Sequence, residues 1–350
     1  MLFYVIFLII IVASLSTYRV GRAGSNVQYK KIREYFGIVI ILIVTLLRFD
    51  VGYDYYNYYQ AVNGDVIDVT VDRFEPLSKV IMYIAHYWHC PQIVFILFGI
   101  ITYYCLFSTF RHYSVNFYLG IIVYIAFFYL SDLSTIRQAA AVAISFYGIK
   151  YIESKSFIKY LLICLIASLF HFSAIVSILI YFLYNDRVKI YYLIILDIFL
   201  LLFSDIVFNL LQGSSYSIYL EVLDEMAGGS MLGFSFILWF ILIFTIDKIF
   251  TNSQSSYKKL YNVIFAGLIF PFVFGGHLGL RLSQYYFIYF CLLIPHVLCN
   301  VNRLVRWSVV FMLFGYFIIA LYINKNSDGA QFIPYKCILF ENTEFLQFRR

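Results

Sequence analysis

Charge is the property that this sequence has least of. Asp, Glu, Lys and Arg together make up 13% of the 350 residues, whereas soluble globular proteins average about 25%. The depletion extends along the whole chain, which excludes a soluble domain that carries a single membrane anchor. Hydrophobic residues make up 63% of the sequence, and its mean hydropathy is +0.85. Apolar runs long enough to cross a bilayer recur between short polar breaks, so the sequence predicts an all-α, polytopic integral membrane protein.

The sequence also lacks the common metal-binding and redox patterns. Its six cysteines form no C-x-x-C pair, and most of them lie in or beside apolar runs, as buried small hydrophobes do. His86, His89 and Cys90 lie close together, but no acidic residue near them completes a metal site. The sequence has no D/E-x-D/E motif of the kind found in many metal-dependent sugar transferases. We therefore expect neither a metal nor another cofactor.

The apolar segments predict about ten to twelve transmembrane helices. No internal repeat, proline-rich linker or low-complexity tail divides them, so we expect a single polytopic membrane domain, residues 1–350. The segments are approximately 1–17, 34–49, 75–89, 91–110, 115–131, 134–152, 157–184, 189–211, 231–250, 258–276, 280–299 and 305–323.

The charges are distributed unevenly between the loops, and this predicts the orientation of the chain. Residues 18–33 contain basic residues and no acid, so this loop is expected in the cytoplasm. The next loop, near 50–75, is strongly acidic and is expected outside, as is the acidic loop near 212–230. The net charge is +6, but the basic residues that produce it lie in the loops between apolar segments. We therefore do not interpret the charge as a nucleic-acid-binding surface, and we expect no nucleic-acid partner.

Segment 157–184 has basic residues at both ends, although a single crossing would place the two ends on opposite sides of the membrane. Two half-helices that meet near His171 would reconcile these flanks, provided that their turn is buried in protein. The basic residues concerned are Lys155, Lys159, Arg187 and Lys189.

Ionisable residues inside or beside apolar segments indicate a specific role, because placing one charged side chain at the middle of the bilayer costs about 2.5–3.5 kcal/mol of insertion free energy. The stretch RFDVGYDYYNYY begins with Arg48 at the end of an apolar run and continues through Gly52 to Asp54 and several tyrosines. A carboxylate beside flat aromatic rings is typical of carbohydrate sites. An aromatic belt at the membrane interface would explain the tyrosines, but not the R-x-D-x-G-x-D pattern.

Three further stretches place polar groups at membrane depth. In TIRQAAAVAI, the alanines indicate close helix packing, whereas Arg137 beside Gln138 suits a lipid-linked pyrophosphate, whose oxygens a guanidinium binds in pairs. In SLFHFSAIV, His171 either bonds to a neighbouring helix or acts as a general base or phosphate ligand. In RLSQYY, Arg281 either extends toward the membrane surface or contacts a phosphate or sugar together with Tyr285.

These motifs resemble those of a known family. RFDVGYDYYNYY, FEPLS, TIRQAAAVAI, SLFHFSAIV, RLSQYY and FIPY occur in the order seen in EpsG-like proteins, the Wzy-type O-antigen and capsular polysaccharide polymerases. The resemblance extends from Arg48 to Tyr335, with one departure at Tyr53, where the family often has Thr. It implies an all-helical membrane fold that is GT-C-like, and an enzyme of lipopolysaccharide or other polysaccharide biosynthesis. Such enzymes join oligosaccharide repeat units carried on undecaprenyl pyrophosphate, at the periplasmic face of the bacterial inner membrane.

The resemblance also suggests roles for individual residues. Displacement of a lipid pyrophosphate needs a base for the acceptor hydroxyl and positive charge for the leaving group. Asp54 and His171 are alternative bases. We expect the pyrophosphate to be bound by Arg48, Arg137 and Arg281, and the glycan to be contacted by Tyr58, Glu75, Gln138 and Tyr285.

Other functions compete with this interpretation. A flippase for the same lipid-linked oligosaccharide would also be polytopic, but such transporters often contain internal repeats. A ligase or another glycosyltransferase that uses the same donor has similar chemistry, although ligases usually build their site on one large outer loop. An acyltransferase would need a motif such as HxxxxD, which the six histidines do not provide. Membrane lipids and a chain-length regulator are the other partners that we expect.

Overall fold

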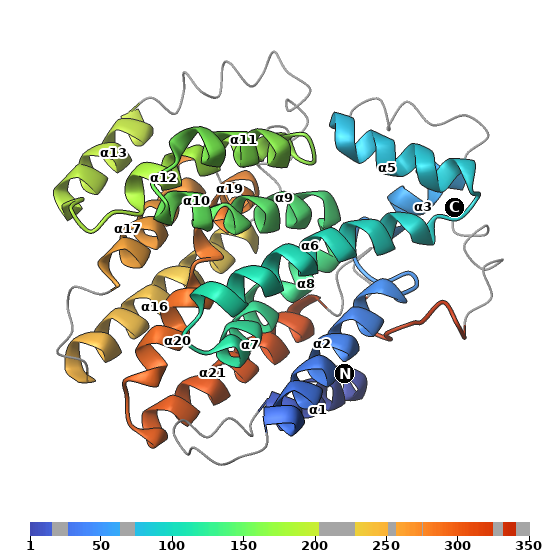
Figure 1. Cartoon of the computed structure of the whole chain (residues 1–350), viewed down its shortest axis with the longest axis horizontal. Helices are drawn as coiled ribbons and strands as arrows, with labels where there is room; N and C mark the ends of the chain where they lie inside the picture. The colour runs from blue at the N-terminus through green and yellow to red at the C-terminus, as the bar shows by residue number, and fades with distance from the viewer. Residues whose placement is uncertain are drawn as a thin grey trace. The chain divides into compact units, whose positions relative to one another are not determined.

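The computed structural model describes residues 1–15, 27–63, 74–202, 228–250, 257–274, 276–324 and 332–340. The described residues are mainly helical (Figure 1), and they include an isolated antiparallel bridge between Arg48 and Cys337. Residues 64–73 of the acidic loop 50–75 lie outside the described residues, as do most of 18–33 and 212–230.

The predicted all-α polytopic membrane fold is confirmed. Three described helices are long and apolar enough to cross a bilayer, and one pair bent by 46° is a further candidate span. Shorter apolar helices accompany them. The long ones are Gln92–Tyr113, Gly233–Phe250 and Arg303–Ile323, the bent pair is Leu278–Phe287 with Phe290–Cys299, and the shorter ones are Leu2–Ala13, Phe36–Leu46, Phe117–Phe127, Phe157–Ser168 and Phe172–Leu183.

The chain divides into two compact units. The first consists of Met1–Tyr104, Ile121–Ala139 and Trp307–Arg350. Within it, α1 packs against α2 and α3 against α5. Its helices, some of which continue into the second unit, are α1 (Leu2–Leu15), α2 (Val27–Leu46), α3 (Tyr55–Asn63), α5 (Pro76–Tyr87), α6 (Gln92–Tyr113), α7 (Phe117–Phe127), α8 (Tyr129–Ser134), α9 (Ile136–Tyr147) and α21 (Arg303–Ile323).

Hydrogen bonds to the last carbonyls of α2 attach its C-terminal end to other parts of the first unit. The final carbonyls of a helix have no partner inside that helix and need one from elsewhere. Here they accept hydrogen bonds from three side chains and one backbone amide. The donors are Tyr335 Oη to Val44 O at 2.8 Å, Arg48 Nη1 to Thr45 O at 3.1 Å, Gln92 Nε2 to Leu46 O, and Ile338 N to Leu47 O at 2.9 Å.

The second unit consists of Cys105–Gly120 and Ala140–Arg306. In it, α19 packs against α16, α17, α18 and the 3-10 helix η1. Besides the shared helices, its elements are α10 (Ile149–Glu153), α11 (Phe157–Ser168), η1 (Phe172–Leu179), α12 (Ile180–Leu183), α13 (Ile190–Leu202), α16 (Gly228–Phe250), α17 (Lys258–Gly267), α18 (Phe270–Val273), α19 (Gly276–Phe287) and α20 (Phe290–Cys299).

Gly279 permits the close packing of α19 on α18. A Cβ atom at this position would lie 2.3 Å from the Phe270 carbonyl oxygen and 2.4 Å from the Pro271 Cα atom, distances at which the backbones would have to separate. The absent side chain therefore sets the distance between two helices, and through it the position of the residues that follow Gly279 on α19.

Segment 157–184 forms a helical hairpin, with α11 as one arm and η1 with α12 as the other. The ring of Phe157 lies 5.0 Å from that of Tyr181, so the two open ends are neighbours. Farther in, Tyr160 Oη donates to Ser177 O at 2.8 Å. α11 has 12 residues, a rise of about 18 Å, whereas the hydrocarbon core is ~30 Å thick. The prediction of two half-helices that meet near His171 is confirmed.

Candidate functional site

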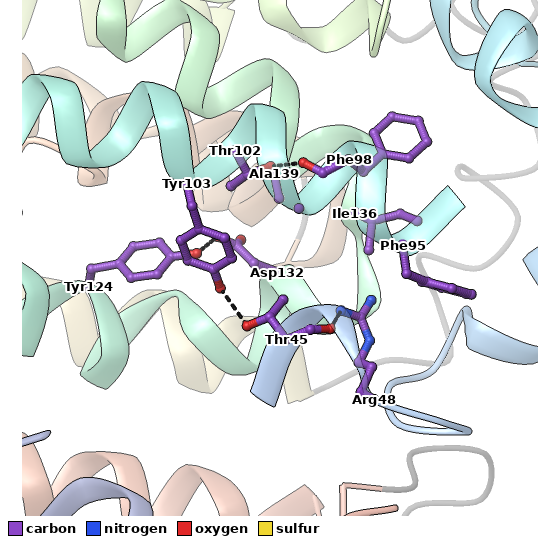
Figure 2. A pocket seen from close by; sticks show the side chains of 11 residues that line it. Thr45, Arg48, Phe95, Phe98, Thr102, Tyr103, Tyr124, Asp132, Ile136 and Ala139 are labelled. Carbon is purple, nitrogen blue, oxygen red and sulfur yellow. Dashed lines mark hydrogen bonds between the residues drawn. The ribbon is translucent and has the colours of Figure 1, made fainter. Parts of the chain in front are cut away.

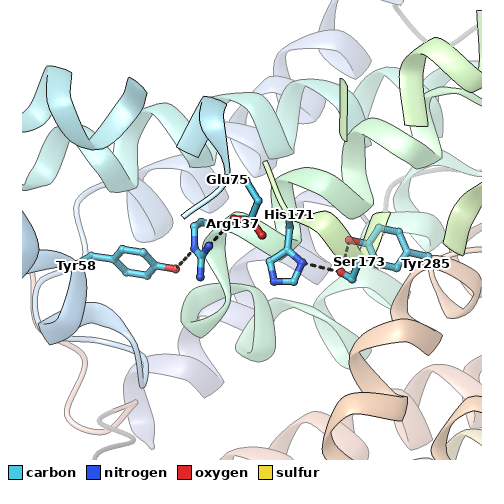
Figure 3. Close-up of polar contacts among 6 residues, drawn as sticks. All are labelled: Tyr58, Glu75, Arg137, His171, Ser173 and Tyr285. Carbon is cyan, nitrogen blue, oxygen red and sulfur yellow. Dashed lines mark hydrogen bonds and ion pairs between the residues drawn. The ribbon is translucent and has the colours of Figure 1, made fainter. Parts of the chain in front are cut away.

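Arg137, Glu75 and Tyr58, three of the predicted site residues, come together in the first unit (Figure 3). Arg137 Nη1 forms an ion pair with Glu75 Oε2 at 2.6 Å, and Arg137 Nε donates to Tyr58 Oη at 3.1 Å. The guanidinium also lies over the ring of Phe74, with its central carbon 4.1 Å from the ring centroid. Contacts along two edges and one face fix the plane of this guanidinium.

The local sequence explains why Glu75 is available to Arg137. Glu75 occupies the N-cap of α5, but its side chain makes no capping hydrogen bond. Pro76 follows at the first helical position, which favours the extended backbone that Glu75 adopts. Arg137 lies in the first turn of α9, where the helix dipole disfavours a cation. The carboxylate of Glu75 offsets this cost, and both side chains keep some exposure, 15% for Arg137 and 12% for Glu75.

Helix α3 brings Tyr58 and Asp54 to the same region of the first unit. Tyr58 is 4% exposed, and its ring lies 6.0 Å from that of Phe74. Asp54 is half-buried just before α3, and its carbonyl accepts from Tyr58 N at 3.2 Å. This bond joins the backbone of Asp54 to the first turn of α3, four positions before the tyrosine that contacts Arg137.

Arg48 has a different environment from the one expected of a pyrophosphate ligand. It is 1% exposed, and it donates to two carbonyl oxygens, Thr45 O at 3.1 Å and Leu133 O at 3.0 Å. Leu133 lies in the last turn of α8, so one guanidinium satisfies the ends of two helices. The ring of Phe95 lies 4.9 Å from its central carbon. In this structure Arg48 joins α2 to α8.

A small cavity of about 10 Å³ lies beside Arg48 (Figure 2). Thr45, Tyr103 and Asp132 also line it, and Tyr124 Oη donates to Asp132 Oδ2 at 2.7 Å. Asp132 lies between the predicted spans 115–131 and 134–152, and burial raises the pKa of its carboxyl to about 7. The volume is about that needed for a single water molecule, which is too small for a sugar or a pyrophosphate.

The segment 332–340 packs along the loop that follows α2. Phe49 N donates to Lys336 O at 3.0 Å, and Lys336 Nζ pairs with Asp50 Oδ2 at 3.2 Å. Burial raises the pKa of the Tyr335 phenol above its ordinary value, which keeps it neutral as the donor to Val44 O. The motif FIPY therefore holds the end of α2 in place.

His171 lies at the tip of the hairpin in the second unit, where it starts a chain of three polar side chains (Figure 3). Its Nδ1 atom lies 2.6 Å from Ser173 Oγ, which lies 2.9 Å from Tyr285 Oη on α19. The backbone of His171 is extended, with φ −155° and ψ 119°, at the point where α11 has ended and η1 begins. His171 is 7% exposed and Tyr285 is 1% exposed.

Two other predicted site residues lie near these groups in the chain. Arg281 is half-buried on α19, one helical turn before Tyr285 and on the same face. Gln138 follows Arg137 on α9 and is 1% exposed. Because successive residues of a helix do not face each other, the two side chains leave α9 in different directions.

Several residues at these sites were not predicted from the sequence. Phe74 and Ser173 each lie one or two positions from a predicted residue, in the motifs FEPLS and SLFHFSAIV, and those motifs were the only available signal. Gln92 gave no signal, since its role depends on distant groups: it donates to Leu46 O and Arg48 O and accepts from Tyr55 Oη at 3.1 Å. Lys336 directly follows FIPY.

Helices of membrane-spanning length, together with the shorter apolar helices around them, define an all-α polytopic membrane protein. A family model described as the EpsG family matches residues 34–337, and the chain belongs to that family. Membership supports a membrane glycan polymerase-like role in polysaccharide biosynthesis. A search of curated proteins and a search of solved structures each found no match.

Proposed function

We propose that this protein is a glycosyltransferase that polymerises oligosaccharide repeat units carried on undecaprenyl pyrophosphate, at the periplasmic face of the bacterial inner membrane. The observation that carries the proposal is the cluster of Arg137, Glu75, Tyr58 and Phe74 in an EpsG-family chain. Side chains that fix a partly exposed guanidinium prepare it to bind phosphate oxygens.

Arg137 is assigned to the leaving group. In the reaction, an acceptor hydroxyl oxygen bonds to the anomeric carbon of the donor sugar, while the bond from that carbon to the phosphate oxygen breaks. The bonding electrons leave with the lipid pyrophosphate, whose added negative charge needs a fixed cation. Tyr58 and Glu75, which hold Arg137, are also close enough to it to bond to the hydroxyls of a bound sugar.

The acceptor hydroxyl loses a proton in the same step, and we assign this proton to His171. An imidazole is a suitable base near neutral pH, and this one is held at its Nδ1 edge. Asp54 is the alternative base. Arg48 is buried and donates to two backbone carbonyls, so we assign it a positioning role: it holds the loop that leads to Asp54. This role replaces the direct pyrophosphate contact that we expected from the sequence. Arg281 remains a candidate pyrophosphate ligand.

The surface glycan of cells that lack the gene tests this function. We expect deletion to leave a core that carries one repeat unit, and the wild-type gene to restore a gel ladder of longer glycans. Loss of even the single repeat would contradict polymerisation, because a flippase or a ligase acts before that product appears.

His171→Ala at matched protein level is expected to lower the polymerisation rate by about 10²–10⁴-fold, the usual contribution of a general base, and to leave mainly single repeats. His112→Ala is the matched control, since His112 is exposed and its Nδ1 atom contacts Ser108 O of its own helix. If Asp54→Asn abolishes the ladder while His171→Ala preserves it, the base is Asp54.

A further inference from the structure

Adjacent tyrosines of α19 hold the hairpin tip that carries His171. Tyr286 Oη donates to Val176 O at 2.7 Å, and Tyr285 Oη lies 2.9 Å from Ser173 Oγ. Both tyrosines are at most 1% exposed. The first contact fixes the backbone of η1, whereas the second continues through Ser173 to the imidazole of His171.

The tip needs such support because its backbone is irregular. η1 has 8 residues in 3-10 geometry, although 3-10 runs longer than about four residues are uncommon. Its carbonyls at Val176 and Ser177 accept from Tyr286 and Tyr160 at 2.7 and 2.8 Å. These two bonds act on the backbone of η1, whereas the bond between Ser173 and His171 acts on the imidazole ring and fixes its orientation.

We propose that Ser173 is a positioning residue for His171: it accepts the Nδ1 proton of the imidazole and is itself held by donating to Tyr285. This arrangement leaves Nε2 as the nitrogen with the lone pair, and therefore as the atom that takes the proton of the acceptor hydroxyl. The hydrogen bond at one ring nitrogen of a histidine sets which nitrogen carries the proton, and because a serine hydroxyl can donate or accept, the acceptor role of Ser173 is the part of the proposal that the experiment tests. The inference rests on the proposed role of His171 as the base.

The tautomer of His171 can be measured without any catalytic assay. In full-length protein labelled with ¹⁵N-histidine and reconstituted in lipid, the His171 signals are assigned in solid-state NMR spectra by their loss in His171→Asn. We expect a protonated Nδ1 and an unprotonated Nε2 in the wild type. In Ser173→Ala a signal from protonated Nε2 should appear. A wild-type spectrum with a protonated Nε2 and an unprotonated Nδ1 overturns the proposal.

Polymerisation provides the second measurement. We expect Ser173→Ala to lower kcat by about tenfold to a hundredfold, a part of what a general base contributes, with KM unchanged and with activity recovered in Ser173→Thr. Tyr285→Phe should lower kcat in the same way. Tyr286→Phe is the matched control, because it removes a bond to η1 without affecting Ser173.

The two measurements separate the possible failures. If the His171 tautomer changes in Ser173→Ala but the wild-type protein does not polymerise, the positioning role of Ser173 is supported and the proposed function is wrong. If both Tyr285→Phe and Tyr286→Phe lower kcat equally while the His171 signals stay as in the wild type, the bond through Ser173 only supports the hairpin, and the inference is wrong.

Discussion

Arg137→Ala is expected to leave surface glycan with a single repeat unit, with a loss of polymerisation of about 10²–10³-fold or more. One preorganised group at a developing negative charge contributes about that much, and Arg137 is the group that we assign to the leaving pyrophosphate. The variant also leaves the carboxylate of Glu75, 12% exposed, without its ion-pair partner, which lowers stability as well. The glycan ladder is therefore measured at matched amounts of folded protein.

Removing both partners separates catalysis from stability. In Arg137→Ala combined with Glu75→Gln, the unpaired carboxylate is gone, so we expect the thermal stability to recover relative to Arg137→Ala alone. Polymerisation should stay low, since the cation is still missing. Arg137→Lys keeps the charge but loses the planar fork, and an intermediate ladder is expected. A full ladder from the double variant would show that the ion pair is only structural.

Gly52→Ala is expected to lower the free energy of unfolding by about 1–3 kcal/mol. Gly52 has φ +103°, a conformation that residues with a side chain rarely adopt. A Cβ atom there would lie 2.5 Å from Leu133 O, the same oxygen that accepts from Arg48 Nη2. The substitution therefore displaces the loop from α8 and disturbs the contact of Arg48.

Gly315→Ala is the control for this prediction. Gly315 lies inside α21, and a Cβ atom there would meet nothing within 4 Å. Alanine favours a helix by about 1 kcal/mol over glycine, so this variant should be as stable as the wild type or more so. Thermal unfolding of the purified protein in detergent measures both. Equal melting temperatures for the two variants would contradict the claim that a side chain at position 52 clashes with Leu133 O.

The fold class could be predicted because hydrophobic length and loop charge are local properties of the sequence. The basic residues at both ends of segment 157–184 were enough to predict its division near His171, and α11 ends at Ser168. Other divisions could not be predicted. Segment 115–131 contains the end of α7 at Phe127 and the start of α8 at Tyr129, within a run of apolar residues that gives no sign of an interruption.

The candidate site was predicted in part for the same reason. Arg137 and Glu75 stood out because charged residues next to apolar runs are rare, and Tyr58 because it follows the R-x-D-x-G-x-D pattern; the structure brings these three together. Arg48 stood out by the same criterion, yet its guanidinium satisfies Leu133 O, 85 positions along the chain. A hydrogen bond to a distant backbone carbonyl leaves no pattern in the sequence. An arginine that bonds to the carbonyls at helix ends therefore cannot be told from a ligand-binding arginine by sequence alone.

The most direct test of the central claim is elongation by the purified protein in lipid vesicles that contain an undecaprenyl-pyrophosphate-linked repeat unit and no other protein. The account predicts products of two and more repeats, with one undecaprenyl pyrophosphate released for each glycosidic bond formed, and no such products from Arg137→Ala. A repeat unit that crosses the bilayer without elongation, or that stays unchanged in the presence of folded protein, would contradict it.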